Sequence, residues 1–372
     1  MSPRSVTQKA KNLCVLVSLA ALLTACATTI PAPPPQQSRP VERPAPLPQQ
    51  PVFKPVAPVT PIASLPPAGL DDAIRNQWLG FPGKTGVAVM RIDTGWTVGQ
   101  RVGEYFPQQS VSKTWVAMTV LDLVDQGRLR LDQKVRISTE DLAVFHQPIR
   151  ERVIAKGVVE ETVLDLLEQA ITASDNTAND SLLRTAGGPD AVRAFIAKRN
   201  LGAIRFGPGE RAMQSAIAGL DWRQEYSVGR RFYTARAAVP YDRRKLALDR
   251  YLADPVDGAS PAAIVAALGR LAKGDLLSAG STQLLLNIMG RVRSGPNRLK
   301  AGVPPEWQFL HKTGTGQELP PVSTGYNDIG IMTAPDGTRY AVAVMMSDTT
   351  ASVPDRMAYM QSISRTVASY HR

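Results

Sequence analysis

The stretch Ser110-Val-Ser-Lys-Thr-Trp-Val-Ala-Met-Thr-Val-Leu-Asp-Leu-Val124 predicts a helix with two reactive side chains in its first turn. Apolar residues recur along it at a spacing typical of one helix face, at Trp115, Met118, Leu121 and Val124. Gly127 ends the pattern. Ser110 and Lys113 are three residues apart, so their side chains share a face of this helix. A serine hydroxyl in that position can act as a nucleophile if the lysine amine is neutral and takes its proton.

Strands are predicted near both ends of the chain, with helices between them. Apolar runs and turn signals predict strands at residues 86–93, 95–103, 307–312, 325–333 and 340–346. Helical patterns cover residues 70–79, 162–172, 179–184, 190–198, 261–273, 281–292 and 355–370. Residues 202–216 are predicted to be irregular. We therefore expect an α+β fold, in which the N- and C-terminal parts form one antiparallel sheet and a helical region is inserted between them, with the active site at the seam.

Two further motifs follow along the chain, Ser174-Asp-Asn176 and Lys312-Thr-Gly314. Each of the three motifs alone is weak evidence, because short strings recur by chance. All three in this order, on the local structures that they require, indicate a serine nucleophile activated by lysine. Burial and nearby positive charge would lower the pKa of such a lysine. Taken alone, Ser110 and Lys113 could instead be a helix cap and a solvated side chain.

The second and third motifs each have a chemical use. The Ser174 hydroxyl can pass a proton to a leaving nitrogen, and Asn176 can donate to a substrate amide and accept from a lysine. Ser174, Asp175 and Asn176 all also suit a helix N-cap, and the capping role is compatible with the chemical one. Lys312 and Thr313 end a predicted strand whose backbone could pair with an extended substrate. Gly314 permits close approach there, and a solvated turn is the alternative.

From Leu70 to the C-terminus, with one long interruption, the chain resembles the class A serine β-lactamases and the related penicillin-binding enzymes through these motifs. The resemblance implies a β-lactamase/D,D-peptidase-like fold, an oxyanion hole from the backbone N–H groups of Ser110 and Thr315, and a carboxylate site at Lys312 and Thr313. The predicted function is β-lactam hydrolysis through a serine acyl-enzyme. The alternatives are a D-Ala-D-Ala peptidase or an esterase on the same scaffold, and an inactive cell-wall-binding lipoprotein.

In the class A enzymes, a Glu on an irregular loop, usually within Glu-x-x-Leu-Asn, positions the water that hydrolyses the acyl-enzyme. Glu210 matches that position, but Met213 and Gln214 replace the Leu and the Asn. Gln214 keeps the amide and adds a methylene, which moves its hydrogen bond and affects deacylation rather than acylation. The alternative for Glu210 is a surface carboxylate beside Arg211.

Some relatives also carry an arginine at the place of Arg298, where it reaches the carboxylate site beside Lys312. A guanidinium suits a carboxylate because it can donate two parallel hydrogen bonds. Residues 317–325, which follow the third motif, contain no arginine that could replace it. The alternative for Arg298 is a surface position.

Residues 221–260 depart from the resembled family, whose members run more directly from the loop Glu to the next helix. This segment holds aromatic residues among several arginines, namely Trp222, Tyr226, Phe232, Tyr233, Tyr241 and Tyr251. We expect it to form a helical cap near the active site. Such a cap could narrow substrate access, contact the cell wall or only cover the surface.

Residues 1–25 are predicted to be an export signal. A positive region comes first, with Arg4, Lys9 and Lys11. The apolar run that follows, residues 13–23, is too short to span a bilayer comfortably. It ends in Leu23-Thr-Ala-Cys26, which resembles a bacterial lipobox and implies lipidation of Cys26. An ordinary signal peptide is the alternative.

The lipobox has consequences for localisation. Residue Ala27 is not Asp, which in lipoproteins of the Gram-negative type favours the outer membrane. We therefore expect a periplasmic enzyme held to that membrane by its lipid. The Pro-rich residues 27–69 would form a semi-rigid tether, and residues 70–372 the catalytic domain.

Composition argues against several other classes of protein. Three histidines and no G-x-S-x-G string speak against a Ser–His–Asp hydrolase. Few histidine or thiol ligands remain for zinc, so neither a metal nor a cofactor is expected. The formal charge is +11, but the arginines are scattered along an exported chain, so nucleic acid is not an expected partner. We expect a monomeric domain that acts on a small β-lactam or a cell-wall peptide.

Overall fold

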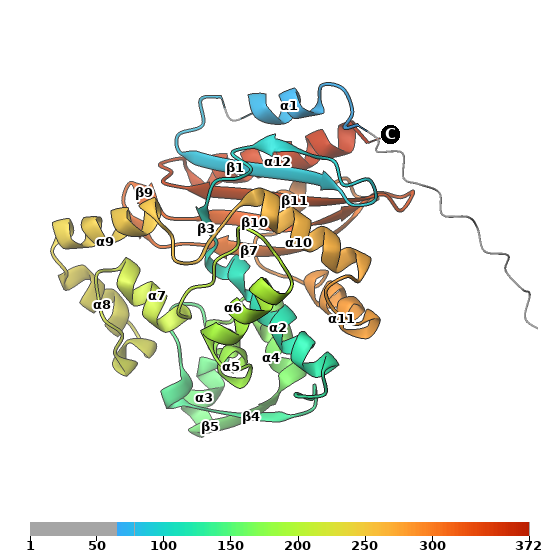
Figure 1. Ribbon diagram of the computed structural model, residues 1–372. Coiled ribbons are helices and arrows are strands. Elements are labelled where there is room, and N and C mark those ends of the chain that lie inside the picture. The colour runs from blue at the N-terminus through green and yellow to red at the C-terminus, as the bar shows by residue number, and fades with distance from the viewer. Residues whose placement is uncertain (1–64, 78, 372) are drawn as a thin grey trace, which may run out of the picture. The chain divides into compact units, whose positions relative to one another are not determined.

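The computed structural model describes residues 65–77 and 79–371, so the predictions made for residues 1–64, which include Cys26, lie outside it. A five-stranded antiparallel sheet organises this part of the chain (Figure 1). Its strands, in spatial order, are β2 (Thr97–Gln100), β1 (Lys84–Arg91), β11 (Arg339–Ser347), β10 (Tyr326–Thr333) and β7 (Gln308–Thr315). The first and last parts of the chain thus share one sheet, as predicted.

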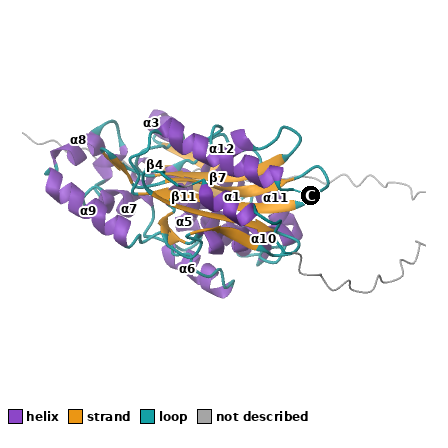
Figure 2. Ribbon diagram, turned by 90° about the horizontal axis from the view of Figure 1, so that it is seen from above, coloured by secondary structure: helices purple, strands orange, loops and turns teal. Residues whose placement is uncertain are grey.

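Each face of the sheet is covered by helices (Figures 1 and 2). Because side chains alternate along a strand, Val342 and Val344 of β11 join one apolar cluster and Ala341 and Ala343 join the other. The first cluster includes residues of α1 (Leu70–Asn76) and α12 (Val353–Ser369). The second includes α10 (Pro261–Lys273) and α11 (Ala279–Met289).

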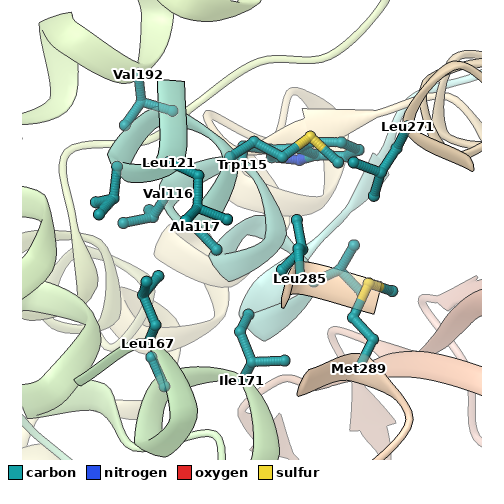
Figure 3. Packing of buried hydrophobic residues seen from close by; sticks show 14 of the residues in the cluster. Trp115, Val116, Ala117, Leu121, Leu167, Ile171, Val192, Leu271, Leu285 and Met289 are labelled. Carbon is teal, nitrogen blue, oxygen red and sulfur yellow. The ribbon is translucent and has the colours of Figure 1, made fainter. Parts of the chain in front are cut away.

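The inserted helical region packs around α2 (Lys113–Asp125), which is buried on almost every side. Its Trp115 is fully buried and lies among apolar side chains from several neighbouring helices (Figure 3). The indole N–H donates to the Gln108 side chain at 2.5 Å, which satisfies its one polar atom. The surrounding helices are α4 (Val163–Thr172), α5 (Asn176–Thr185) and α6 (Pro189–Lys198).

Several predicted boundaries differ from the structure. The helix expected from Ser110 begins with a 3-10 turn, Gln109–Ser112, and becomes α-helical at Lys113. The strand predicted to end at Lys312 continues to Thr315, so the whole third motif lies inside β7. The sequence did not predict the hairpin of β4 (Lys134–Ser138) and β5 (Val158–Thr162), nor the short α3 (Arg150–Lys156) between them.

The prediction of an irregular segment at residues 202–216 is wrong for its last part. Glu210 starts a helix, α7 (Glu210–Ile217). Gly209 enters it with φ 99°, a conformation that favours glycine. The Asp180 carboxylate accepts from the Glu210 backbone N–H at 3.2 Å. This carboxylate comes from another part of the chain, so local sequence did not reveal the helix start.

The segment 221–260 is largely helical, as expected. After a 3-10 turn, Gln224–Ser227, it forms α8 (Arg231–Ala238) and α9 (Tyr241–Ala253), and it ends in β6 (Gly258–Ala259). Strand β6 pairs with β3 (Phe106–Pro107), which leads directly into the turn that carries Ser110. Helices α7, α8 and α9 lie together at one end of the fold (Figures 1 and 2).

Short elements complete the described region: β8 (Glu318–Leu319) pairs with β9 (Val322–Ser323), and 3-10 turns lie at Thr139–Asp141 and Leu299–Gly302. Across residues 65–77 and 79–371, no helix combines the length and the apolar character needed to cross a membrane.

Candidate active site

Ser110 is presented on the 3-10 turn between β3 and α2, and the turn is held from three directions. The backbone N–H of Gln109, which has φ 53°, donates to the Asp257 carboxylate at 2.7 Å. The Asn327 side chain donates to the Gln108 carbonyl at 3.1 Å. At Gly314, an added Cβ would lie 2.4 Å from that carbonyl oxygen. Glycine therefore permits the close approach expected of this position.

Lys113 connects the nucleophile to two other predicted site residues. Its ammonium lies 2.8 Å from the Ser110 hydroxyl, 2.8 Å from Asn176 Oδ1 and 2.5 Å from Glu210 Oε1. The Lys113 side chain is fully buried and that of Glu210 is 5% exposed. Three acceptors thus meet the three donors of an ammonium group. The arrangement provides a path for a proton from Ser110 through Lys113 to a buried carboxylate.

A second hydroxyl–lysine contact joins Ser174 to Lys312, whose side chain is fully buried. Lys312 Nζ donates to Ser174 Oγ at 2.9 Å and to the Thr313 carbonyl at 2.8 Å. Ser174 has φ 59°, so its backbone is in the left-handed region that L residues rarely adopt. Burial lowers the pKa of Lys312 well below its ordinary value, and the positive charges of Lys113 and Arg298 lower it further.

The helix-capping role considered for the second motif belongs to Asp175 rather than to Ser174 or Asn176. The Asp175 carboxylate accepts from the Ala178 N–H at 3.0 Å and from the Ile149 N–H at 2.7 Å. Asn176 begins α5, and its amide donates to the Val144 carbonyl at 2.8 Å. That bond orients its amide oxygen towards Lys113.

Arg298 reaches the end of β7 and is not a surface residue. Its guanidinium donates to the carbonyls of Gly314 at 2.8 Å and Asn327 at 2.7 Å, and to Thr315 Oγ1 at 2.5 Å. It also lies 3.7 Å from the ring centre of Tyr326. Burial lowers the pKa of Arg298. The guanidinium thus joins β7 to β10 and lies beside the hydroxyl that Thr315 presents to the cleft.

Gln214 lies one helical turn after Glu210 and donates to its Oε2 at 3.2 Å. The same amide nitrogen donates to Gln109 Oε1 at 2.9 Å. The Gln317 amide donates to Gln214 Oε1 at 3.0 Å. The extra methylene of Gln214 therefore places its amide among three polar side chains. The sequence did not single out Gln109 or Gln317, although each lies beside a recognised motif.

These side chains surround a cleft of about 840 Å³. Ser110, Ser174 and Glu210 line it, together with the other predicted residues Asn176, Gln214, Arg298, Thr313 and Thr315. Residues that the sequence did not assign to the site complete the wall, namely Phe145, His146, Ala173, Tyr233, Arg236, Ser294, Gly316, Gln317 and Glu318. Tyr233 and Arg236 belong to α8, so the segment 221–260 forms one side of the cleft.

The described part of the chain holds no cluster of three or more His, Cys, Asp and Glu side chains suited to a metal ion. The reactive side chains that the site brings together are two lysines, two serines and one carboxylate. Among them, Lys113 and Lys312 each contact a serine hydroxyl. A nucleophile with a base, and a separate hydroxyl with a cation, are the groups that acyl transfer requires.

Comparison with known proteins gives a consistent result. Residues 69–371 match the sequence pattern of the β-lactamase enzyme family. β-Lactamase VEB-1 of Pseudomonas aeruginosa is 27% identical over 299 residues, which are 80% of this chain and 89% of the relative. β-Lactamase SME-1 of Serratia marcescens is 30% identical over 237 residues, or 63% and 67%. A solved ancestral class A β-lactamase has a TM-score of 0.63 and 31% identity, and covers 81% of this chain and 100% of its own. The similarity thus spans all three motifs.

Proposed function

Because this chain belongs to the β-lactamase enzyme family, as a serine β-lactamase of class A that hydrolyses β-lactams, we propose that the reaction forms an acyl-enzyme on Ser110 and that Glu210 activates the water that releases it. The observation that carries the proposal is the position of Lys113, whose amine contacts both Ser110 and Glu210.

In acylation, Lys113 first gives a proton to Glu210, and its neutral amine then takes the proton of Ser110 while Ser110 Oγ bonds to the β-lactam carbonyl carbon. The backbone N–H groups of Ser110 and Thr315 stabilise the resulting oxyanion. Collapse of this intermediate breaks the carbon–nitrogen bond of the ring. The nitrogen then needs a proton.

Ser174 supplies that proton. Since the Lys312 ammonium can only donate, Ser174 Oγ accepts from it and keeps its own hydrogen for the leaving nitrogen. The hydroxyl is replenished by the proton that left Ser110. Lys312, Thr313 and Thr315 hold the substrate carboxylate beside this relay, and Arg298 adds positive charge behind Thr315. Asn176 donates to the substrate amide.

In deacylation, Glu210 takes a proton from water, the water oxygen bonds to the acyl carbon, and the bond from that carbon to Ser110 Oγ breaks as Lys113 returns a proton to the serine. General-base catalysis of this kind contributes about 10²–10⁴-fold. The Gln214 amide lies beside Glu210 Oε2 and can hold the same water. Deacylation thus depends on a carboxylate that acylation uses only through Lys113.

The test is intact-protein mass spectrometry of the full chain mixed with benzylpenicillin and sampled from seconds to hours. We expect a transient adduct in the wild type, no adduct in Ser110→Ala and a long-lived adduct in Glu210→Gln. Glu225→Gln, a change at an exposed carboxylate of the segment 221–260, is the matched control and should behave as wild type. A wild-type adduct that persists would contradict the role of Glu210 and favour a D-Ala-D-Ala peptidase.

The proposal also includes a location. The resemblance of Leu23-Thr-Ala-Cys26 to a lipobox supports the proposal that Cys26 is lipidated and attaches the protein to the outer membrane from the periplasmic side. We propose that the catalytic domain acts there as a monomer. Labelling cells with a palmitate analogue tests it: the label should be lost in Cys26→Ser and retained in Cys14→Ser. Label retained in Cys26→Ser would exclude the anchor.

A further inference from the structure

The direction in which the Gln214 amide points decides whether it supports Glu210. Its NH₂ group can donate to the Glu210 carboxylate, whereas its oxygen would repel it. Gln214 Nε2 lies 3.2 Å from Glu210 Oε2 and 2.9 Å from Gln109 Oε1, and Gln214 Oε1 lies 3.0 Å from Gln317 Nε2. Both amide neighbours could in principle turn over as well. The direction must therefore be set by groups that can bond in one sense only.

The first such group is Arg236 of α8. A guanidinium has donors and no acceptor. Arg236 Nη1 donates to Gln317 Oε1 at 3.0 Å, so the Gln317 NH₂ group must face the other way. It donates to the Gln214 backbone carbonyl at 2.7 Å and to Gln214 Oε1 at 3.0 Å. The Gln214 NH₂ group is thereby left to face Glu210.

The second group is Asp257, which follows α9 and has the opposite polarity. Burial raises the pKa of Asp257 to about 6. At a pH above that value its carboxylate is ionised and has acceptors and no donor. Asp257 Oδ1 accepts from the Tyr251 hydroxyl at 2.8 Å, so the Tyr251 oxygen is free to accept from the Gln109 amide at 2.5 Å. Gln109 Oε1 then faces Gln214 and accepts from its NH₂ group at 2.9 Å.

The two series of hydrogen bonds, one from Arg236 and one from Asp257, start at groups of opposite polarity. Both require the same direction of the Gln214 amide. Both start in the segment 221–260, and Gln109, Gln214 and Gln317 are each at most 8% exposed, so water competes little for their bonds. We propose that the segment 221–260 positions the deacylating pair, with Arg236 and Tyr251 as positioning residues that fix the Gln214 amide against Glu210. This inference rests on the proposed role of Glu210 and gives the segment a part in the reaction.

The length of Gln214 fits this role. The amide group of an asparagine lies one methylene closer to the helix axis. From the same position on α7, it would not reach both Gln109 and Gln317. The three helices concerned, α7, α8 and α9, lie side by side in both views (Figures 1 and 2). The longer side chain of Gln214 therefore suits the hydrogen-bond partners that the segment 221–260 holds in place.

The test measures acylation and deacylation rate constants separately for the full chain with benzylpenicillin. In Tyr251→Phe, we expect deacylation to slow about tenfold, the effect of about one lost hydrogen bond, with acylation unchanged. Gln317→Glu removes the donor to Gln214 from the hydrogen-bond series that starts at Arg236, because a carboxylate cannot donate. This variant should slow deacylation at least as much. The matched control is Tyr226→Phe, a buried tyrosine in the aromatic cluster of the same segment, which should leave both rate constants unchanged.

A double-mutant cycle separates positioning from a general loss of structure. If Tyr251 acts through Glu210, Tyr251→Phe should have almost no further effect on adduct lifetime in the Glu210→Gln background. Unchanged deacylation in both Tyr251→Phe and Gln317→Glu, with Glu210→Gln still trapping the adduct, would overturn the inference and leave the proposed function intact. Rapid deacylation in Glu210→Gln would overturn both.

Discussion

The Lys312 ammonium donates to the Ser174 hydroxyl across 2.9 Å, although the two residues are 138 positions apart in the chain. This contact connects β7, an edge strand of the five-stranded sheet, to the loop before α5. It brings a buried cation to the hydroxyl that we assign to proton transfer. Two motifs that are separate in sequence are thereby parts of one site.

The low pKa of Lys312 predicts an early loss of activity at alkaline pH. Lysine is cationic below its pKa, and burial together with Lys113 and Arg298 lowers that pKa. Binding of the substrate carboxylate should therefore fail as pH rises through a value well below that of an exposed lysine. The pH dependence of kcat/KM for benzylpenicillin measures this. In Lys312→Arg the alkaline limb should move to higher pH, because arginine stays charged; an unmoved limb would contradict the assignment.

Removal of the Ser174 hydroxyl should slow acylation by about 10²-fold, the lower end of the range for general acid–base catalysis. The acylation rate constant can be measured by stopped flow for Ser174→Ala and Ser174→Gly. Both variants lack the hydroxyl and should lose the same activity. Because Ser174 has φ 59°, the glycine variant should be the more stable of the two by about 1 kcal/mol. A glycine variant with wild-type acylation would exclude the relay.

Asp180 should make the protein less stable as pH rises from about 4 to about 7. Burial, and then the charge of Glu210, raise the pKa of Asp180 to about 6 in the folded state. A raised carboxyl pKa contributes stability that is fully present below the unfolded value and is lost as pH rises through the folded value. The free energy of unfolding of the wild type should therefore fall relative to Asp180→Asn, by about 3 kcal/mol in all. The Asn oxygen can still accept from the Glu210 N–H, and a pH-independent difference between the two proteins would refute the prediction.

Gly314→Ala should destabilise the fold and displace the nucleophile. Its Cβ would lie 2.4 Å from the Gln108 carbonyl oxygen, so either β7 or the turn that carries Ser110 must move. We expect a loss of about 1–3 kcal/mol and a larger loss in the rate of adduct formation. Gly280→Ala in α11 is the control, since its Cβ would meet no atom within 4 Å. That change should leave activity unaltered and stabilise the helix by about 0.5–1 kcal/mol. Chemical denaturation compares the two variants.

Much of the site could be predicted from the sequence because its motifs combine local geometry with chemistry. The three-residue spacing of Ser110 and Lys113 places both in one turn, whether 3-10 or α-helical. Apolar periodicity predicted the strands at both ends of the chain and the helices between them. The resemblance to class A β-lactamases predicted the family that the comparisons show.

Tertiary structure decided what depends on partners distant in the chain. The start of α7 at Glu210 depends on Asp180, and the direction of Gln214 depends on Arg236 and Asp257. No local pattern reports these bonds, because a hydrogen bond requires atoms to meet in space and sequence spacing defines only neighbours. The sequence by itself thus determined the fold class, the family and the candidate reactive groups. Only the folded chain determined their protonation environment and orientation, since both arise from burial and from contacts between separate elements.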